Sequence, residues 1–187
     1  GLPSGLLWCS HNVGAINPED YGNYYAWGET STKNYYDWNT YAYGSDMDQL
    51  TKYCSKSGYG LDGYTDSLTT LLPTDDAATV NMGDGARTPT WLEWKELLDN
   101  TTSEWTSLNG INGYRFTASN GNSIFLPAAG RFYEGSANSV GGNGYYMSAS
   151  LYETFPYYAW HLYFYADYRD VQSGGFREIG RPVRAVR

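Results

Sequence analysis

The segment Trp160-His161-Leu162-Tyr163-Phe164-Tyr165 places two kinds of side chain on alternating positions. Successive side chains of a β-strand point to opposite faces, so Trp160, Leu162 and Phe164 share one face. That face is apolar, and we expect it to anchor the strand in a hydrophobic core. The opposite face carries His and Tyr, which can contact both water and a partner. The segment therefore predicts a strand whose second face, with the polar and aromatic residues around it, is a binding surface.

The length and composition of the chain favour one domain rich in strands. The 187 residues suit a single domain, 1–187, with one full core. Aromatic residues reach 18%, with 20 Tyr, beside 22 Gly and only 17% charged residues. Many Tyr and Gly with few Lys or Glu favour short strands and turns over long helices.

The charge of the chain argues against two classes of partner. The net charge is -8, and the 12 Lys and Arg are too few and too scattered to make the basic face that nucleic acid requires. The same deficit argues against an anionic membrane surface. No apolar run approaches the roughly 20 residues that span a bilayer. We therefore expect no nucleic-acid partner and no direct membrane insertion.

The two cysteines, Cys9 and Cys54, leave two alternatives open. Neither belongs to a CxxC pair, so zinc binding and thioredoxin-like chemistry have no support. The pair would close a long loop if it formed a disulfide. Two buried thiols are the other alternative, because the sequence does not place their Cα atoms.

Helix signals occur at three places. Thr90 precedes Glu93 by three residues, just ahead of an apolar run, which is the spacing of a capping box. The apolar stripe that follows predicts a helix that faces the core. Shorter helices are expected over residues 73–80 and from Pro18, with Asn17 as its cap.

Strand signals predict a hairpin and a pairing of the two termini. Gly113–Thr117 and Ser123–Leu126 flank Asn120-Gly121, a pair that tolerates the positive φ angles of a tight turn. The strand expected at Leu6–Trp8 needs a partner, and Pro182–Val186 is the candidate.

The sequence offers no convincing catalytic set. The only histidines are His11 and His161, and no Gly-x-Ser-x-Gly elbow exists. The acid pairs Glu19-Asp20 and Asp75-Asp76 stand at expected helix starts, where acids offset the helix dipole. Asp46-Met47-Asp48 lacks the ordered oxygen ligands of a known calcium loop. We therefore expect a protein that is not an enzyme and has neither cofactor nor metal.

Several motifs that follow one another along the chain carry a family resemblance. They are Gly5-Leu6-Leu7-Trp8, Asn12-Val13-Gly14-Ala15, Tyr25-Ala26-Trp27-Gly28-Glu29-Thr30, Arg87-Thr88-Pro89-Thr90-Trp91-Leu92-Glu93-Trp94, Asn122–Gly130 and Val183–Arg187. Together they resemble a large family of secreted domains from anaerobic gut bacteria that is related to the Fibrobacter major paralogous domain.

The resemblance implies an α+β, C-type-lectin-like fold. Such a fold has a twisted mixed or antiparallel sheet, two main helices and paired termini. The resemblance also implies kinship with formylglycine-generating enzymes, which need reactive cysteines late in the chain. No cysteine follows Cys54, so that activity is not carried over.

A further resemblance is to the variable proteins of diversity-generating retroelements. Their C-terminal part displays ligand-binding side chains that adenine-directed mutagenesis rewrites, so residues 145–187 become the candidate variable, ligand-display region. Asn-type template codons can become Tyr, Asp, His, Arg or Phe. The candidate ligand-binding residues are Tyr152, Tyr157, Tyr158, His161, Tyr163, Tyr165, Asp167, Tyr168, Arg169 and Phe176.

Two functions from different classes remain. The first is a bacterial protein, secreted or on the cell surface, whose Tyr-rich face binds a protein or glycan ligand on another cell or phage. Tyr supplies large, rigid contact area at low entropic cost. The second is a structural or assembly domain of a cell-surface appendage, with no diversified site and with Tyr side chains that only pack.

Overall fold

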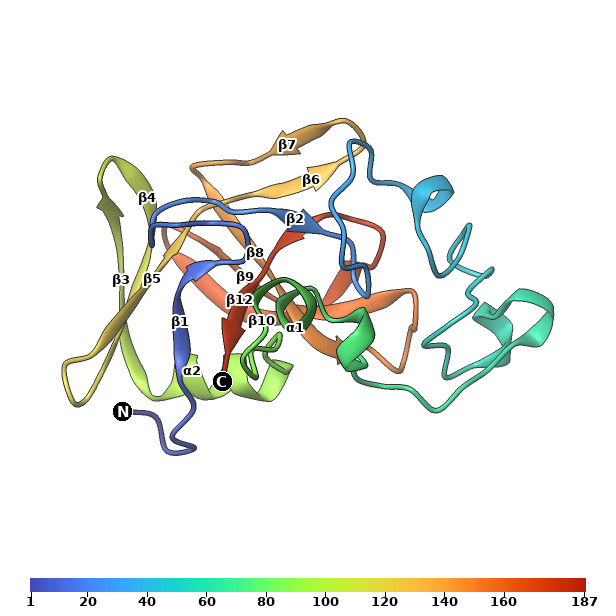
Figure 1. Ribbon diagram of the computed structural model, residues 1–187, viewed down its shortest axis with the longest axis horizontal. Coiled ribbons are helices and arrows are strands. Elements are labelled where there is room, and N and C mark those ends of the chain that lie inside the picture. The colour runs from blue at the N-terminus through green and yellow to red at the C-terminus, as the bar shows by residue number, and fades with distance from the viewer.

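The computed structural model describes residues 1–187, and strands dominate it (Figure 1). Strands account for 40% of the chain and helical residues for 14%. One three-stranded sheet, here the C-terminal sheet, has the order β10-β9-β8. Its strands are β8 (Asn143–Leu151), β9 (Tyr158–Tyr165) and β10 (Tyr168–Phe176).

The other sheets are small and antiparallel. The strands β3 (Thr101–Leu108), β4 (Ile111–Ala118) and β5 (Ser123–Pro127) form a second three-stranded sheet at one end of the molecule (Figure 1). Three two-stranded pairs complete the set: β1 (Trp8–Asn12) with β12 (Arg184–Val186), β2 (Tyr24–Tyr25) with β11 (Arg181–Pro182), and β6 (Arg131–Tyr133) with β7 (Ser136–Asn138).

The α-helices are few and short. They are α1 (Ala77–Met82) and α2 (Trp91–Asp99). Single 3₁₀ turns stand at Trp38–Thr40, Ser57–Tyr59, Leu61–Gly63 and Pro73–Asp75. None of the helices is long and apolar enough to cross a membrane.

The expected C-type-lectin-like α+β fold with two main helices is therefore wrong. Only α2 completes two turns, and α1 has six residues before it ends at Gly83, which has a φ of 64°. The named strands pair only in antiparallel fashion and are divided among several small sheets, so no single twisted mixed sheet organises the chain. The Tyr- and Gly-rich composition favours this outcome, because it supplies turns and short strands in place of helix-forming residues.

The helix expected from Pro18 is also wrong. Residues 16–19 form a bend and a turn. The carboxylate of Asp20 accepts hydrogen bonds from the backbone N–H groups of Ile16 and Asn17, at 3.2 and 2.8 Å. This local bonding of Asp to the preceding backbone competes with helix formation.

Three local predictions are confirmed. Helix α2 begins with the capping box, in which Thr90 Oγ1 accepts from the Glu93 N–H and a Glu93 carboxylate oxygen accepts from the Thr90 N–H. Strands β4 and β5 form the hairpin. Strands β1 and β12 pair the terminal segments, with Asn12 opposite Arg184.

The C-terminal sheet presents one face to the core as the alternation in β9 predicts. Leu162 and Phe164 are 0% exposed and pack in a cluster with Trp94 of α2 and Tyr146 of β8. The indole N–H of Trp94 donates to the Met147 carbonyl oxygen at 3.0 Å, which ties α2 to β8. On the other face of β9, Ala159 packs with Met147 in a second core cluster, so only the end of that face with Tyr163 and Tyr165 reaches solvent.

The two cysteines are free thiols, and no disulfide joins them. Cys54 is buried, and its thiol donates to the Lys56 carbonyl oxygen at 3.2 Å. Burial raises the pKa of the Cys54 thiol, so the thiolate is disfavoured.

Phe164→Ala tests the core-facing side of β9. Removing a fully buried ring leaves a cavity, so we expect the free energy of unfolding to fall by about 3–5 kcal/mol. The matched control is Tyr165→Ala, one residue on and 41% exposed, which should cost about 1 kcal/mol or less. Urea unfolding followed by tryptophan fluorescence measures both, and equal losses would contradict the assignment of the two faces.

Candidate ligand-binding face

The solvent side of the C-terminal sheet carries a continuous set of aromatic rings, here called the outer face. Cross-strand neighbours share a face, and the register places Tyr145 opposite Tyr163, Gln172 opposite His161, and Tyr168 opposite Tyr165. The outer face consists of Asn143 and Tyr145 from β8, His161, Tyr163 and Tyr165 from β9, and Tyr168, Asp170 and Gln172 from β10.

Tyr163 stands at the centre of these rings. Its centroid lies 4.8 Å from that of Tyr145, 5.9 Å from Tyr165 and 6.1 Å from Tyr168. Tyr165 and Tyr168 stack at 5.4 Å with 19° between their planes. Such ring pairs restrict one another's rotation, so the outer face has a defined shape.

Two amide side chains hold the tyrosine hydroxyls. Asn143 donates from Nδ2 to the Tyr163 hydroxyl oxygen at 2.9 Å, and Gln172 donates from Nε2 to the Tyr168 hydroxyl oxygen at 2.8 Å. The Tyr168 hydroxyl accepts the bond from Gln172 and keeps its own proton free to donate to a ligand. No local sequence pattern marks Asn143, Tyr145 or Gln172 as part of this face, because their position depends on the strand register.

His161 lies on the predicted side of β9 but is buried, with 7% exposure, so its expected exposed position is wrong. Burial lowers its pKa well below the usual range, and the positive charge of Arg181 lowers it further. The imidazole is therefore neutral at physiological pH. The alternation in β9 predicts the face that His161 occupies, but no local pattern predicts the side chains that cover it.

Asp167 and Arg169 do not both join the outer face. Asp167 is exposed in the two-residue turn between β9 and β10. Arg169 pairs with Phe164 and so belongs to the opposite side of the sheet. Its guanidinium carbon lies 5.6 Å from the centroid of the Tyr114 ring. The prediction that Arg169 contributes to the Tyr-rich patch is therefore wrong.

Tyr157, Tyr158 and Phe176 form a second cluster at the other end of the sheet. The ring centroids of Tyr157 and Tyr158 are 4.4 Å apart, and those of Tyr158 and Phe176 are 4.7 Å apart. Tyr59 joins this cluster from the irregular part of the chain, 5.2 Å from Tyr157. Phe176 also lines a pocket with His161, which connects the cluster to the outer face.

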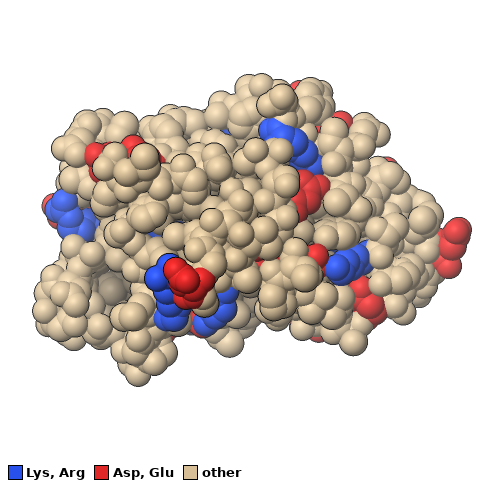
Figure 2. Space-filling view, in the orientation of Figure 1, with Lys and Arg blue, Asp and Glu red and all other residues tan.

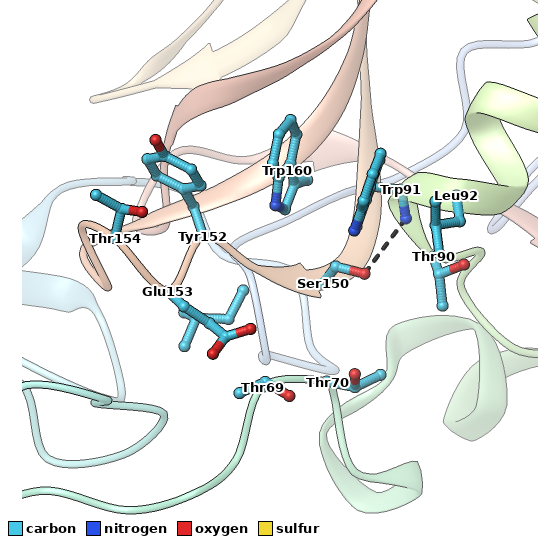
Figure 3. Close-up of a pocket in the computed structure, with 11 residues that line it drawn as sticks. Thr69, Thr70, Thr90, Trp91, Leu92, Ser150, Tyr152, Glu153, Thr154 and Trp160 are labelled. Carbon is cyan, nitrogen blue, oxygen red and sulfur yellow. Dashed lines mark hydrogen bonds between the residues drawn. The ribbon is translucent and has the colours of Figure 1, made fainter.

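Tyr152 lies apart from both groups, in a hollow of about 430 Å³ (Figure 3). Its ring meets the Trp160 ring edge-on at 5.3 Å, and Trp160 stacks on Trp91 at 4.9 Å. Trp160 is therefore half-buried against the start of α2 and does not belong to the core cluster of Leu162. The hollow is also lined by Thr69, Thr70, Ser150 and Glu153, so Tyr152 belongs to a separate cavity.

A smaller pocket of about 190 Å³ opens within the outer face. Its wall includes residues that the sequence analysis did not single out, above all Arg131 and Arg181. The Arg131 guanidinium carbon lies 5.1 Å from the centroid of the Tyr145 ring. Arg181 is buried, and it donates from Nη1 to the Phe176 carbonyl oxygen at 2.7 Å. Burial lowers the pKa of Arg181 to about 10, so it stays charged at neutral pH.

Glu178 is a buried acid beside this pocket. Burial raises the pKa of Glu178 to about 7, although the nearby charges of Arg181 and Arg177 lower it. Its Oε2 atom makes no hydrogen bond.

Charged side chains are sparse across the face drawn in Figure 2. No group of three or more His, Cys, Asp or Glu residues is placed to hold a metal ion.

The titration of Glu178 predicts a pH dependence of stability. The folded state keeps a proton on Glu178 up to a pH of about 7, whereas the unfolded chain releases it near the ordinary value of 4.5. Stability is therefore full below 4.5 and falls as the pH rises to about 7, by up to roughly 3 kcal/mol. Glu178→Gln keeps a neutral side chain at every pH and removes this loss.

Urea unfolding of both proteins between pH 5 and 8 measures the effect. The stability of Glu178→Gln relative to the unsubstituted protein should increase from pH 5 to about 7 and then level off, because Glu178 is ionised in both the folded and the unfolded state above that pH. The two histidines are present in both proteins, so their titration largely cancels in the difference. A stability difference that stays constant with pH would show that Glu178 is already ionised in the folded state.

Comparison with known proteins yields no relative: no protein-family model, no curated protein and no solved structure matches this chain.

Proposed function

We propose that this protein is a binding module whose outer face contacts a macromolecular ligand through its tyrosines. The observation that carries the proposal is the set of contiguous Tyr rings on the solvent side of a sheet whose opposite side is packed in the core. Tyr combines a large apolar surface with a hydroxyl that can donate and accept, which suits it to protein and glycan contacts.

The order within the outer face supports a role in binding. A side chain that must be immobilised on association costs about 0.5–1.5 kcal/mol. Tyr163 and Tyr168 are already held by Asn143 and Gln172 and by their ring neighbours. Much of the free-energy cost of immobilising these side chains therefore arises on folding and not on binding.

The ligand that this surface suits is a protein or a glycan on another cell or phage. The protein has a net charge of -8, which makes nucleic acid a poor partner because both are negatively charged. No cofactor enters the proposal, and the protein is proposed to be a secreted or cell-surface binder and not an enzyme.

The burial pattern supports a further part of the proposal, that residues 145–187 are diversified by a retroelement. Tyr is among the residue types that adenine mutagenesis can produce. Tyr163, Tyr165 and Tyr168 are at least partly accessible to solvent. Between them stand Leu162 and Phe164, which are fully buried and suit unvaried positions. A nearby reverse-transcriptase gene and a template copy of this coding region, with adenines at the variable positions, would support diversification. A locus without them would contradict it.

A structural or assembly domain is the second candidate. The rings of the outer face contact one another, and Tyr163 is only half-exposed, so these side chains also contribute packing. In that case the rings would serve stability or subunit contacts, and substitution would first lower the free energy of unfolding.

The combined variant Tyr163→Ala, Tyr165→Ala, Tyr168→Ala separates the two candidates. Labelled protein is applied to a glycan array and to arrays of intact bacterial cells and phage particles. We expect the variant to lose at least about tenfold of the binding signal, because central aromatic contacts dominate binding energy. Circular dichroism and urea unfolding report whether it remains folded.

The matched control is Tyr35→Ala with Tyr64→Ala, two exposed tyrosines outside the outer face. It should bind as the unsubstituted protein does. Unchanged binding by the folded triple variant would rule out the outer face as the site. A large loss of stability without a specific loss of binding would favour the structural candidate.

A further inference from the structure

The pocket within the outer face gathers two arginine Nε donors and one histidine ring nitrogen that have no hydrogen-bond partner in the protein. His161 Nδ1, Arg131 Nε and Arg181 Nε are buried and make no hydrogen bond in the protein. All three residues line this one pocket of about 190 Å³. Buried polar atoms without partners are few in folded proteins and cost about 1–3 kcal/mol each. Two of them, Arg131 Nε and Arg181 Nε, can only donate, and their presence at one opening indicates that a ligand supplies the missing acceptor.

Gly175 brings two of these side chains together. A β-bulge separates the pairing of Gln172 from that of Gly175, so one extra residue of β10 lies beside β9 here. A Cβ atom at Gly175 would lie 2.7 Å from His161 Nδ1 and 2.9 Å from Arg181 Nη2. Both nitrogens therefore approach the bare backbone of Gly175, and any larger residue would collide with them.

Two guanidinium groups, those of Arg131 and Arg181, line the pocket without a salt bridge, and the buried acid Glu178 is their one nearby carboxylate. Arg131 lies close enough to disfavour the charge on Arg181, and Glu178 is the one carboxylate that favours it. Asp170 stands opposite Tyr163 in the register but does not line the pocket. Two guanidinium groups that face one opening repel each other unless an anion lies between them.

We propose that this pocket binds an oxyanion, a carboxylate, sulfate or phosphate group carried by the ligand of the outer face. Guanidinium groups bind such planar or tetrahedral anions with directed hydrogen bonds. The neutral His161 donates through Nδ1 when its proton resides there. Tyr145, Tyr163 and Phe176 give the wall its aromatic part and contact the ligand beside its charged group. This inference rests on the proposed function and names the ligand chemistry for the same surface.

Titration of the folded protein with sodium sulfate, inorganic phosphate and sodium acetate, at constant ionic strength, tests the proposal. Nuclear magnetic resonance follows the arginine Nε–H signals and the His161 ring. We expect saturable shifts at Arg131, Arg181 and His161 with at least one anion, and the strongest anion identifies the class. Neutral methyl glucoside should produce no such shifts. The absence of saturable shifts with all three anions at tens of millimolar would overturn the proposal.

Two variants make the result specific. Arg131→Met removes a half-buried guanidinium while keeping an apolar stem over Tyr145, and it should weaken anion affinity at least about tenfold, the effect of losing one charge-assisted contact. Gln172→Glu places a negative charge in the wall and should abolish binding. The control Arg115→Met removes an arginine on β4 that lies outside the pocket, and it should leave the affinity unchanged. Equal losses in Arg131→Met and Arg115→Met would mean a general charge effect and would also overturn the proposal.

The test of anion binding and the test of the proposed function can fail independently of each other. Tyr165 and Tyr168 do not line the pocket, so Tyr165→Ala with Tyr168→Ala should keep sulfate binding while losing the macromolecular ligand. Failure of anion binding in a protein that still binds its ligand through Tyr165 and Tyr168 removes the oxyanion assignment alone. Retained anion binding without any Tyr-dependent ligand removes the proposed function alone.

Discussion

The side chain of Arg177 is the contact on which the arrangement of this molecule depends. Its guanidinium is fully buried, forms no salt bridge and lies 4.9 Å from the centroid of the Trp27 ring. Its hydrogen bonds, each about 3 Å long, go to the Tyr41 hydroxyl and to the carbonyl oxygens of Lys52, Tyr53 and Pro156. A buried charge with unmet donors is very costly, so these acceptors must be in place together. One residue after β10 thus joins the irregular segment 31–72 to the C-terminal sheet.

The same residue links the core to the outer face. Phe176 and Glu178 are its chain neighbours, and Phe176 lines the pocket in which His161 and Arg181 lie. Because the Arg177 side chain is anchored in the core, the backbone on either side places Gly175 and Arg181 in defined positions. The tyrosines of the outer face are held separately by Asn143 and Gln172. The attachment of this segment to the core and the ordering of the surface tyrosines therefore depend on different residues.

Sequence reasoning succeeded where a structure depends on neighbours in the chain and failed where it depends on distant ones. The capping box at Thr90 and the Asn-Gly hairpin follow from local chemistry, and the alternation in β9 assigns its faces because one side is strongly apolar. The fold as a whole was predicted wrongly, because the division of strands into small sheets depends on contacts between remote segments. No local pattern marks that division.

The candidate site shows the same limit. Arg169 was expected beside the Tyr-rich patch, but the two-residue turn after Tyr165 sets the register of β10 and places it opposite Phe164. An arginine between polar residues gives no clue to its side. His161 was placed on the right face but not recognised as buried, since Arg181 and Gly175 approach it from outside β9. The sequence does not predict that Arg131 and Arg181 line the pocket, because each lies in a short strand outside the aromatic stretch.

The position of β10 at the rim of the C-terminal sheet bears on solubility. An uncovered edge strand is a template for pairing with another chain, and a row of tyrosines beside it adds to that hazard. β10 carries the exposed charges Arg169 and Asp170, and its bulge before Gly175 breaks the regular row of backbone groups. Charges and bulges at an edge discourage strand addition. Amino-acid substitutions on the adjoining aromatic surface therefore leave this protection of the sheet edge against aggregation in place.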